Sequence, residues 1–291
     1  MTNKLCWIAG LTALAALSQA QFGAAGGFNL YARQNVNSSG SDTEGRIAAG
    51  NNIGLNNYDV GLVTPGGDVL VAGAQINFSN GTIRGNARYG FSFTGVNTAF
   101  TNGGSAIPGV PIDFLATDAT LLATSASWGS LGTNGTISQP FSTLNLVGTN
   151  PITNVFNITN AQLNSVTGVD ISIPAGSTAL INVQSAFVNF PNIGYNLNGN
   201  QVPPSIFKKV VWNLPIATSV NMTNLKGSLL APQASVSTGF GAIDGQIFVN
   251  NFSGPMQVNW QQFDGTVVPE PATLIALGAG ALALARRRKK S

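Results

Sequence analysis

The sequence contains no histidine and a single cysteine, Cys6, and only 8% of its 291 residues are charged. Cys6 lies in an apolar run close to the N-terminus that we expect to be removed, so the mature chain would carry no thiol. These absences exclude disulfides, thiolate nucleophiles, imidazole bases and the usual zinc sites. The chemistry that remains for a catalytic site is narrow.

Basic residues are scarce once the two ends of the chain are set aside. Lys4 and the basic run at residues 286–290 account for six of the 13 Lys and Arg residues, which leaves seven basic against ten acidic residues. The net charge of +3 therefore comes from the ends, and the central part of the chain is mildly acidic. Because nucleic-acid binding requires a basic face on the folded domain, we expect no nucleic-acid partner.

What the sequence does contain is typical of a β protein. Hydrophobic residues make up 44% of the chain, which supplies enough apolar surface for a core and argues against disorder. Glycine accounts for 35 residues, and Asn, Ser, Thr and Gly separate short β-branched runs. This pattern predicts many short strands with uncharged turns and outer faces. We expect residues 21–264 to form one large, mainly β domain.

The N-terminus has the features of a secretory signal peptide. Lys4 precedes an apolar run over residues 5–17, and Ser18-Gln19-Ala20 places small residues at both recognition positions of a signal-peptidase site. We predict that signal peptidase cuts between Ala20 and Gln21, so that residues 1–20 are a signal peptide.

The C-terminus combines a pair of prolines, a short apolar segment and a basic tail. Pro269, Glu270 and Pro271 come first, and residues 272–285 follow without a charge. As a helix this segment would reach roughly 21 Å against about 30 Å of hydrocarbon, so we expect a weak transmembrane anchor suited to later removal. The tail would stop transfer and stay in the cytoplasm under the positive-inside rule. It consists of Arg286, Arg287, Arg288, Lys289 and Lys290.

The order of these features over residues 265–291 resembles the PEP-CTERM sorting signal of Gram-negative bacteria. The resemblance implies that an exosortase, a membrane cysteine protease, recognises Pro269-Glu270-Pro271 and cuts nearby, so the inner-membrane anchor would be transient. It also implies an exopolysaccharide-producing surface or biofilm system. We therefore expect an exported protein at the cell surface, in the outer envelope or in the extracellular matrix.

Three related pieces in the central part of the chain predict the coils of a solenoid. They span residues 45–49, 67–72 and 227–231; each begins with Gly and ends with Ala, and an apolar Ile or Val follows. A coil needs short alternating strands, a small Ala where the interior is tight and Gly at the corners. Ordinary β-sandwich strands with Gly turns are the alternative.

Residues 111–128 show a helical period instead. Pro111 suits a helix start and Gly129 an end, so we predict one amphipathic helix between them. Its apolar stripe consists of Phe114, Leu121, Leu122 and Trp128, with Leu115 beside it. We also predict a polar loop over residues 34–44 and a linker over residues 264–268. Alternating patterns predict strands over residues 143–147, 154–158, 169–173, 179–183 and 210–215.

Taken together, these landmarks resemble a choice-of-anchor A domain, a bacterial surface module that is followed by different anchoring signals. The resemblance covers residues 22–263 and is carried by segments 28–30, 44–50, 156–158, 174–183, 211–215, 227–232 and 243–246. It implies an adhesive domain shaped like ice-binding proteins: a right-handed β-solenoid with one helix packed alongside. It brings no catalytic residues to this chain.

The residues leave two functions open. The first is a non-catalytic adhesin that binds exopolysaccharide or another matrix component, because a flat solenoid face would offer polar groups to sugar hydroxyls and aromatic groups to sugar rings. The alternative is a polysaccharide hydrolase or lyase, since glycoside hydrolysis needs only two carboxylates. Asp42 and Glu44 are the candidate acid pair, and solvated loop residues are their preferred interpretation. We therefore expect a protein without enzymatic activity.

The other candidate residues give weaker signals. Asp113 and Asp118 are a second acid pair, and Trp212 and Trp260 are expected in the core rather than as sugar platforms. No cofactor is expected: loop carboxylates could hold Ca²⁺, but the EF-hand and nonapeptide spacings are absent. Ice binding would need Thr-x-Thr ladders at coil period, and none recurs.

Overall fold

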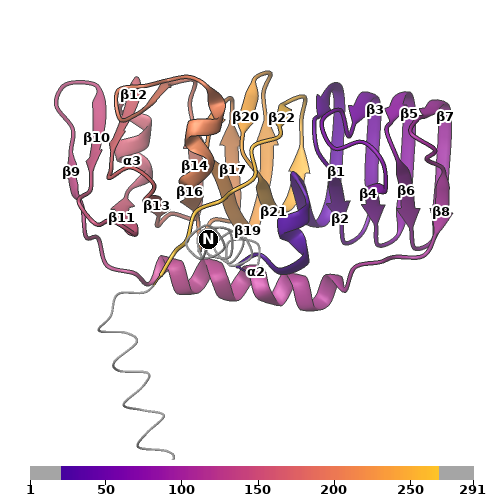
Figure 1. The fold of residues 1–291 in the computed structure, drawn as a ribbon, viewed down its shortest axis with the longest axis horizontal. Coiled ribbons are helices and arrows are strands. Elements are labelled where there is room, and N and C mark those ends of the chain that lie inside the picture. The colour runs from indigo at the N-terminus through magenta and orange to yellow at the C-terminus, as the bar shows by residue number, and fades with distance from the viewer. Residues whose placement is uncertain (1–20, 269–291) are drawn as a thin grey trace, which may run out of the picture.

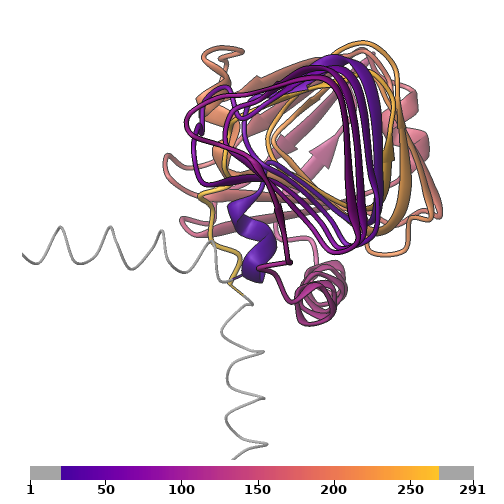
Figure 2. The same cartoon turned by 90° about the vertical axis from the view of Figure 1, so that its right-hand side faces the viewer.

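The structure, a computed structural model, describes residues 21–268 and is a β-solenoid. Within these residues, parallel strands of successive coils stack into three ladders around a triangular interior (Figures 1 and 2). The predicted solenoid with a helix alongside is confirmed, and the sandwich alternative is not. The predicted signal peptide, sorting motif, membrane segment and basic tail lie outside the described residues. In the described part, no helix has the length and apolar character needed to cross a membrane.

The first ladder, called the helix face, carries the long helix on its outer side. Its strands pair in parallel along the length of the solenoid (Figure 1). In spatial order they are β11 (Thr153–Ile158), β13 (Thr178–Val183), β16 (Val210–Asn213), β19 (Ser228–Thr238), β21 (Ile247–Ser253), β1 (Leu30–Thr43), β2 (Ile47–Ala49), β4 (Asp68–Ala72), β6 (Asn86–Tyr89) and β8 (Ala106–Pro108).

The second ladder, called the polar face, lies beside the helix face. It starts with β14 (Phe187–Phe190) and β17 (Ser219–Met222), continues through the later residues of β19, β21 and β1, and ends with the first halves of β3 (Ile53–Val60), β5 (Gln75–Ile83) and β7 (Ser92–Phe100).

The third ladder, called the third face, closes the triangle. It contains β18 (Leu225–Lys226), β20 (Ala242–Asp244) and β22 (Gln257–Asn259), followed by the last residues of β1, β3, β5 and β7. A separate four-stranded sheet of β9 (Thr136–Ser138), β10 (Thr143–Val147), β12 (Gly168–Ser172) and β15 (Gly194–Leu197) lies at one end. The shorter helices are η1 (Gly23–Gly27), α3 (Asn160–Asn164) and η2 (Pro204–Lys209).

The chain enters and leaves the solenoid in its middle. Residues 30–108 wind from β1 to one end, α2 (Phe114–Gly129) runs back along the helix face, and residues 136–259 wind from the other end back to β1 (Figure 1). The strand β1 therefore lies between the second coil and the last one. Asn29 holds this seam, because its side-chain amide donates to the carbonyl oxygens of Gly245 (2.9 Å) and Asn259 (3.1 Å).

Small residues form one column of the interior. Ala32, Ala49 and Ala72 are in register on successive coils, and Val249 and Ala231 continue the column on the other side of β1. All of them are fully buried. The Gly-to-Ala pieces that predicted coils are therefore coil strands, and their alanines lie in the interior as expected.

The helix predicted over residues 111–128 is present as α2. Its first turn is capped by the carboxylate of Asp113, which accepts a hydrogen bond of 3.0 Å from a backbone N–H. Leu121 and Trp128 are buried, as predicted. Leu115, which was expected beside the apolar stripe, is instead 84% exposed, because it lies on the side of the helix that faces away from the sheet.

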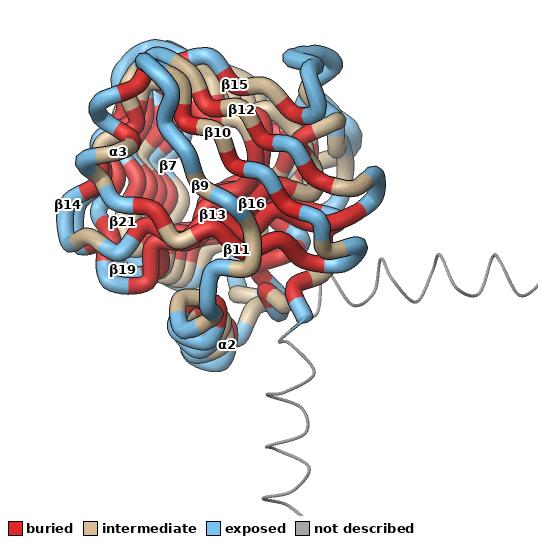
Figure 3. The backbone as a smooth tube through the Cα atoms, turned by 90° about the vertical axis from the view of Figure 1, so that its left-hand side faces the viewer, coloured by how far each residue is buried: buried red, intermediate tan, exposed pale blue. Residues whose placement is uncertain are grey.

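Buried amides dock the C-terminal half of α2. Asn157, Asn182 and Asn213 are in register on β11, β13 and β16, which lie above the helix in Figure 3. Their side chains are linked in series, with Nδ2 to Oδ1 distances of 2.8 Å from Asn213 to Asn182 and 2.9 Å from Asn182 to Asn157. Asn213 also donates to the carbonyl of Ser125 and Asn182 to that of Trp128 (both 2.9 Å). Because carbonyls at a helix end lack intrahelical partners, this ladder satisfies them and fixes the helix.

Two segments that were expected to be irregular belong to the ordered domain. Residues 34–44 were predicted as a polar loop, but β1 continues to Thr43 because β3 and β21, distant in sequence, pair with it on both sides. Residues 264–268 were predicted as a linker, but Thr266 donates its N–H to Thr178 Oγ1 and accepts from Thr153 Oγ1 (both 2.9 Å). The first prediction was wrong because local sequence does not reveal a distant pairing partner. Residues 264–268 form neither helix nor strand, and they pack against the domain through these two hydrogen bonds.

Candidate functional site

Two parallel columns of uncharged and mostly polar residues cover the outer side of the polar face. The column nearer the helix face runs Phe187, Ser219, Ser235, Asn251, Asn35, Asn52, Gln75 and Ser92. The second column runs Asn189, Asn221, Ser237, Ser253, Asn37, Gly54, Asn77 and Thr94. No member of either column is charged. The face therefore presents amides and hydroxyls at the regular spacing of the strands, about 4.7–4.9 Å.

The amides of the first column are held by one another. Asn35 Nδ2 donates to Asn251 Oδ1 (3.1 Å), and Asn251 Nδ2 donates to Ser235 Oγ (3.1 Å). On the other side, Asn51 Nδ2 donates to Asn35 Oδ1 (3.2 Å). Because Ser235, Asn251 and Asn35 are bonded in series across three coils, a ligand would meet polar groups there whose positions are already fixed.

A column of left-handed residues makes the corner between the polar face and the third face. Gly40, Asn57, Asn80 and Asn97 occupy the same place on successive coils, with φ of 67°, 49°, 55° and 48°. Asn and Gly are the residues that adopt this conformation most readily. Asn97 Nδ2 also donates to Asn80 Oδ1 (3.0 Å). The sharp corner keeps the polar face flat up to its edge.

A shallow groove of about 420 Å³ interrupts the polar face at Gly54. Asn37, Asn56 and Asn77 line it together with Ser79. A Cβ atom at Gly54 would lie 2.7 Å from Asn37 Oδ1, so the groove and the position of this amide both depend on glycine. The groove combines amide donors, amide acceptors and a hydroxyl in one open depression, which suits a neutral, hydroxyl-rich ligand.

The candidate acid pair lies on another surface, the third face. Asp42 is on β1 beside Asp59 of β3, and burial raises the pKa of the Asp42 carboxyl, with the negative charges of Glu44 and Asp59 adding to the increase. Glu44 accepts a hydrogen bond from the backbone N–H of Trp260 (2.7 Å) across the seam. The interpretation as solvated loop residues was wrong for Asp42, which is half-buried in β1. Glu44 lies in a bend after this strand and joins the first coil to the last.

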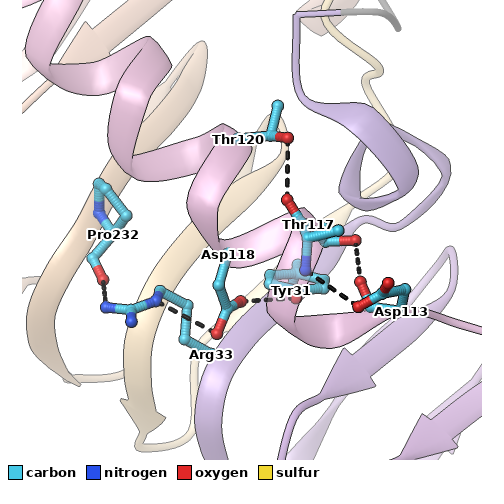
Figure 4. Close-up of polar contacts among 8 residues, drawn as sticks. Tyr31, Arg33, Asp113, Thr117, Asp118, Thr120 and Pro232 are labelled. Carbon is cyan, nitrogen blue, oxygen red and sulfur yellow. Dashed lines mark hydrogen bonds and ion pairs between the residues drawn. The ribbon is translucent and has the colours of Figure 1, made fainter.

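The two carboxylates of the second acid pair, Asp113 and Asp118, have different partners. Asp113 caps α2, whereas Asp118 accepts a hydrogen bond from the Tyr31 hydroxyl (2.7 Å) and forms an ion pair with Arg33 (3.4 Å), as Figure 4 shows. Arg33 in turn donates to the Pro232 carbonyl (3.0 Å). Burial raises the pKa of Asp118 and that of Tyr31. These contacts dock the N-terminal half of α2 on the solenoid and leave no free carboxylate pair there.

The structure confirms the predicted core position of one tryptophan. Trp212 is fully buried in the solenoid, where Nε1 donates to the Lys226 carbonyl (3.0 Å) and the ring makes edge contacts with Phe190 and Tyr195. Trp260 is half-buried against Gly45 at the seam. Among residues 21–268, no group of three or more acidic, Cys or His side chains is placed to hold a metal ion.

The residues of the polar face were not singled out from the sequence. Their asparagines and serines were assigned to turns and outer faces in general, because Asn and Ser have low strand propensity and nothing local shows that they share a column. The available signal is the recurrence of Asn two residues apart, as in Asn35 and Asn37, but only the register of distant strands turns it into a surface.

Two family models match the chain. The model described as "Putative Ice-binding-like adhesive domain" matches residues 21–260, and that of the PEP-CTERM protein-sorting motif matches residues 267–289. No curated protein matches the chain.

Three ice-binding proteins are among the similar solved structures. One is from the Antarctic ascomycete Antarctomyces psychrotrophicus (16% identity, TM-score 0.44, covering 84% of this chain and 98% of that chain). A second is a glycosylated protein from an Arctic yeast (13%, TM-score 0.38, 86% and 95%). The third comes from an Antarctic biological consortium (13%, TM-score 0.32, 82% and 88%).

Proposed function

Because the chain belongs to the family of ice-binding-like adhesive domains, we propose that it binds an extracellular polysaccharide through the polar face and acts without catalysis. The PEP-CTERM motif and the adhesive domain together mark an exported, cell-surface protein of bacteria. We place it more narrowly among the choice-of-anchor A modules of Gram-negative bacteria, in a biofilm or exopolysaccharide matrix.

One observation carries this proposal: apart from Phe187 and Gly54, the two columns of the polar face consist of uncharged donors and acceptors, which repeat along the face. An amide can both donate to and accept from a sugar hydroxyl, and a hydroxyl can do the same. A row of such groups at strand spacing favours a polymer with repeating hydroxyls over a single small molecule. The absence of charge from both columns favours a neutral polymer, or a neutral stretch of a charged one.

The positions of the chain ends are consistent with an anchored adhesin. The Gln21 side chain accepts a hydrogen bond from the N–H of Val267 (3.3 Å), so the predicted mature N-terminus lies beside the residues that precede the sorting motif. Phe22 and Val267 both pack in the cluster between the helix face and α2. An anchor attached here would leave the polar face, which α2 does not cover, open to the surroundings (Figure 2).

We propose that both ends are processed. Signal peptidase would release residues 1–20, and exosortase would cut near Pro269-Glu270-Pro271 and remove the transient anchor with its basic tail. In a host with exosortase, the intact mass of the exported protein should then match a chain that begins at Gln21 and ends near Pro269. A surface species that still carries Arg286 would refute the C-terminal part.

Binding and catalysis are separated by one assay on the purified exported protein. Retention on host exopolysaccharide is compared for the native protein, for Asn37→Ala with Asn77→Ala on the polar face, and for Asp42→Asn with Glu44→Gln on the third face. We expect the polar-face variant alone to lose retention, and no variant to release soluble fragments. If the native protein releases fragments and the acid variant does not, the protein is a hydrolase and the binding proposal is refuted. Retention that survives the polar-face change would refute the site.

A further inference from the structure

One end of the solenoid has strand edges that nothing in the described chain covers. The strand β7 pairs with β5 and β8 pairs with β6, and within residues 21–268 their pairing stops at these inner neighbours. Both strands lie at the outer limit of the molecule (Figure 1). An edge strand presents a row of free N–H and C=O groups and is a ready template for another chain.

At the opposite end, other segments of the chain shield the outermost strand edges of the helix face and the polar face (Figure 3). On the helix face, the backbone N–H of Asn134 donates to the Val155 carbonyl (3.1 Å) at the outer edge of β11. On the polar face, the Asn160 side chain in α3 accepts from the N–H of Asn189 in β14 (3.0 Å). In the separate sheet, the outer strand β9 is antiparallel to β10 and has only three residues, so the edge left there is short. Solenoids generally need such covering at their ends for solubility.

The uncovered end also lacks the charges that keep strand edges apart. Residues 89–112 contain no Asp, Glu, Lys or Arg. Phe91 is 76% exposed and Val96 55% exposed on this coil. The rings of Tyr89, Phe93 and Phe100 lie next to one another, with centroid distances of 6.2 and 5.6 Å, and pack only partly buried against the interior. Natural proteins commonly place Lys, Pro or an inward charge on an edge of this kind; β8 carries Pro108, whereas β7 carries none of these residues.

We propose that this end is the interface of a homodimer, in which two copies pair their β7 edges about a two-fold axis. A two-fold contact places the same patch on both sides, with residue i of one copy against residue j of the other and j against i, so a segment without charge can face itself without repulsion. At the far end, the outer strand β9 is only three residues long and offers a poor edge to a further copy, so the assembly closes at two. The dimer would double the length of the solenoid and the number of polar faces that reach the same polymer, which raises avidity. This inference does not depend on the identity of the ligand.

The experiment measures the molar mass of the purified exported protein by sedimentation equilibrium over a range of concentrations. Thr94 and Ala99 are exposed on β7, one on the polar face and the other on the third face. One variant combines Thr94→Lys with Ala99→Lys, and a second combines Thr94→Asp with Ala99→Asp. The matched control places two lysines on the same polar face away from both ends, as Asn221→Lys with Ser237→Lys.

We expect a monomer–dimer equilibrium for the native protein and for the control, and at least tenfold weaker association for each end variant alone. An equimolar mixture of the lysine and aspartate variants should regain the dimer at low salt, because opposite charges then face each other. Unchanged unfolding midpoints show that the variants are folded. The inference is overturned if the native protein stays monomeric, if it forms assemblies larger than two, or if the control loses association as strongly as the end variants.

Discussion

The buried asparagine ladder gives the sharpest test of how the helix is held. In Asn213→Ala, the Asn182 Oδ1 atom loses its donor at 2.8 Å, the Ser125 hydroxyl loses its acceptor at 2.6 Å, and the Ser125 carbonyl loses a donor at 2.9 Å. Both Asn182 and Ser125 are buried, so water does not readily replace the lost partner. A buried polar group without a partner costs about 1–3 kcal/mol, and we expect the free energy of unfolding to fall by about 2–5 kcal/mol.

The assay is urea unfolding followed by tryptophan fluorescence and circular dichroism. For a domain of this size the loss corresponds to a decrease in the melting temperature of roughly 5–15 °C. The matched control is Asn221→Ala, an exposed asparagine on a neighbouring strand, which should change stability by less than about 0.5 kcal/mol. Ser125→Ala with Asn213→Ala completes a double-mutant cycle, with an expected coupling energy of about 0.5–3 kcal/mol.

Two results would refute this reasoning. If Asn213→Ala lowers the free energy of unfolding no more than Asn221→Ala does, the ladder does not stabilise the fold and water can replace its hydrogen bonds. If the cycle shows no coupling between Ser125 and Asn213, their contact does not help to hold the helix.

Three further changes test other parts of the structure. Ala231→Phe should lower the free energy of unfolding by about 1–3 kcal/mol, because the interior column has no room for a ring; an unchanged urea midpoint would place Ala231 outside. Leu121→Ala should cost about 2–5 kcal/mol, whereas Leu115→Ala, on the exposed side of the same helix, should cost little; equal effects would contradict the docking of α2. Asp42→Asn should stabilise the protein at pH 7. The folded pKa of Asp42 is raised, so its ionisation penalty is present above that pKa and absent below the unfolded value; stabilisation that persists at pH 3 would contradict the burial effect.

The sequence alone determined the features that depend on local chemistry. The prediction of α2 succeeded because Pro111 and Gly129 bracket one continuous segment in which apolar residues recur at helical spacing. The coil strands at Ala49, Ala72 and Ala231 were recognisable for the same reason, since Gly and Ala are required where coils turn and approach each other. The family model for the sorting motif likewise matches the residues that the charge and proline pattern had marked.

Only the tertiary structure decided which residues share a surface. The stretch from Asn35 to Asp42 has the composition of a loop, and it becomes a strand because β3 and β21 supply hydrogen bonds from far along the chain. Asn182 and Asn213 are buried, and Asn157 is half-buried, because each amide finds another at the same position on the next coil. An isolated buried amide would be costly, and a stacked one is satisfied. Register between distant strands therefore created the polar face, the docking of the helix and the difference between the two ends, and no local pattern encodes that register.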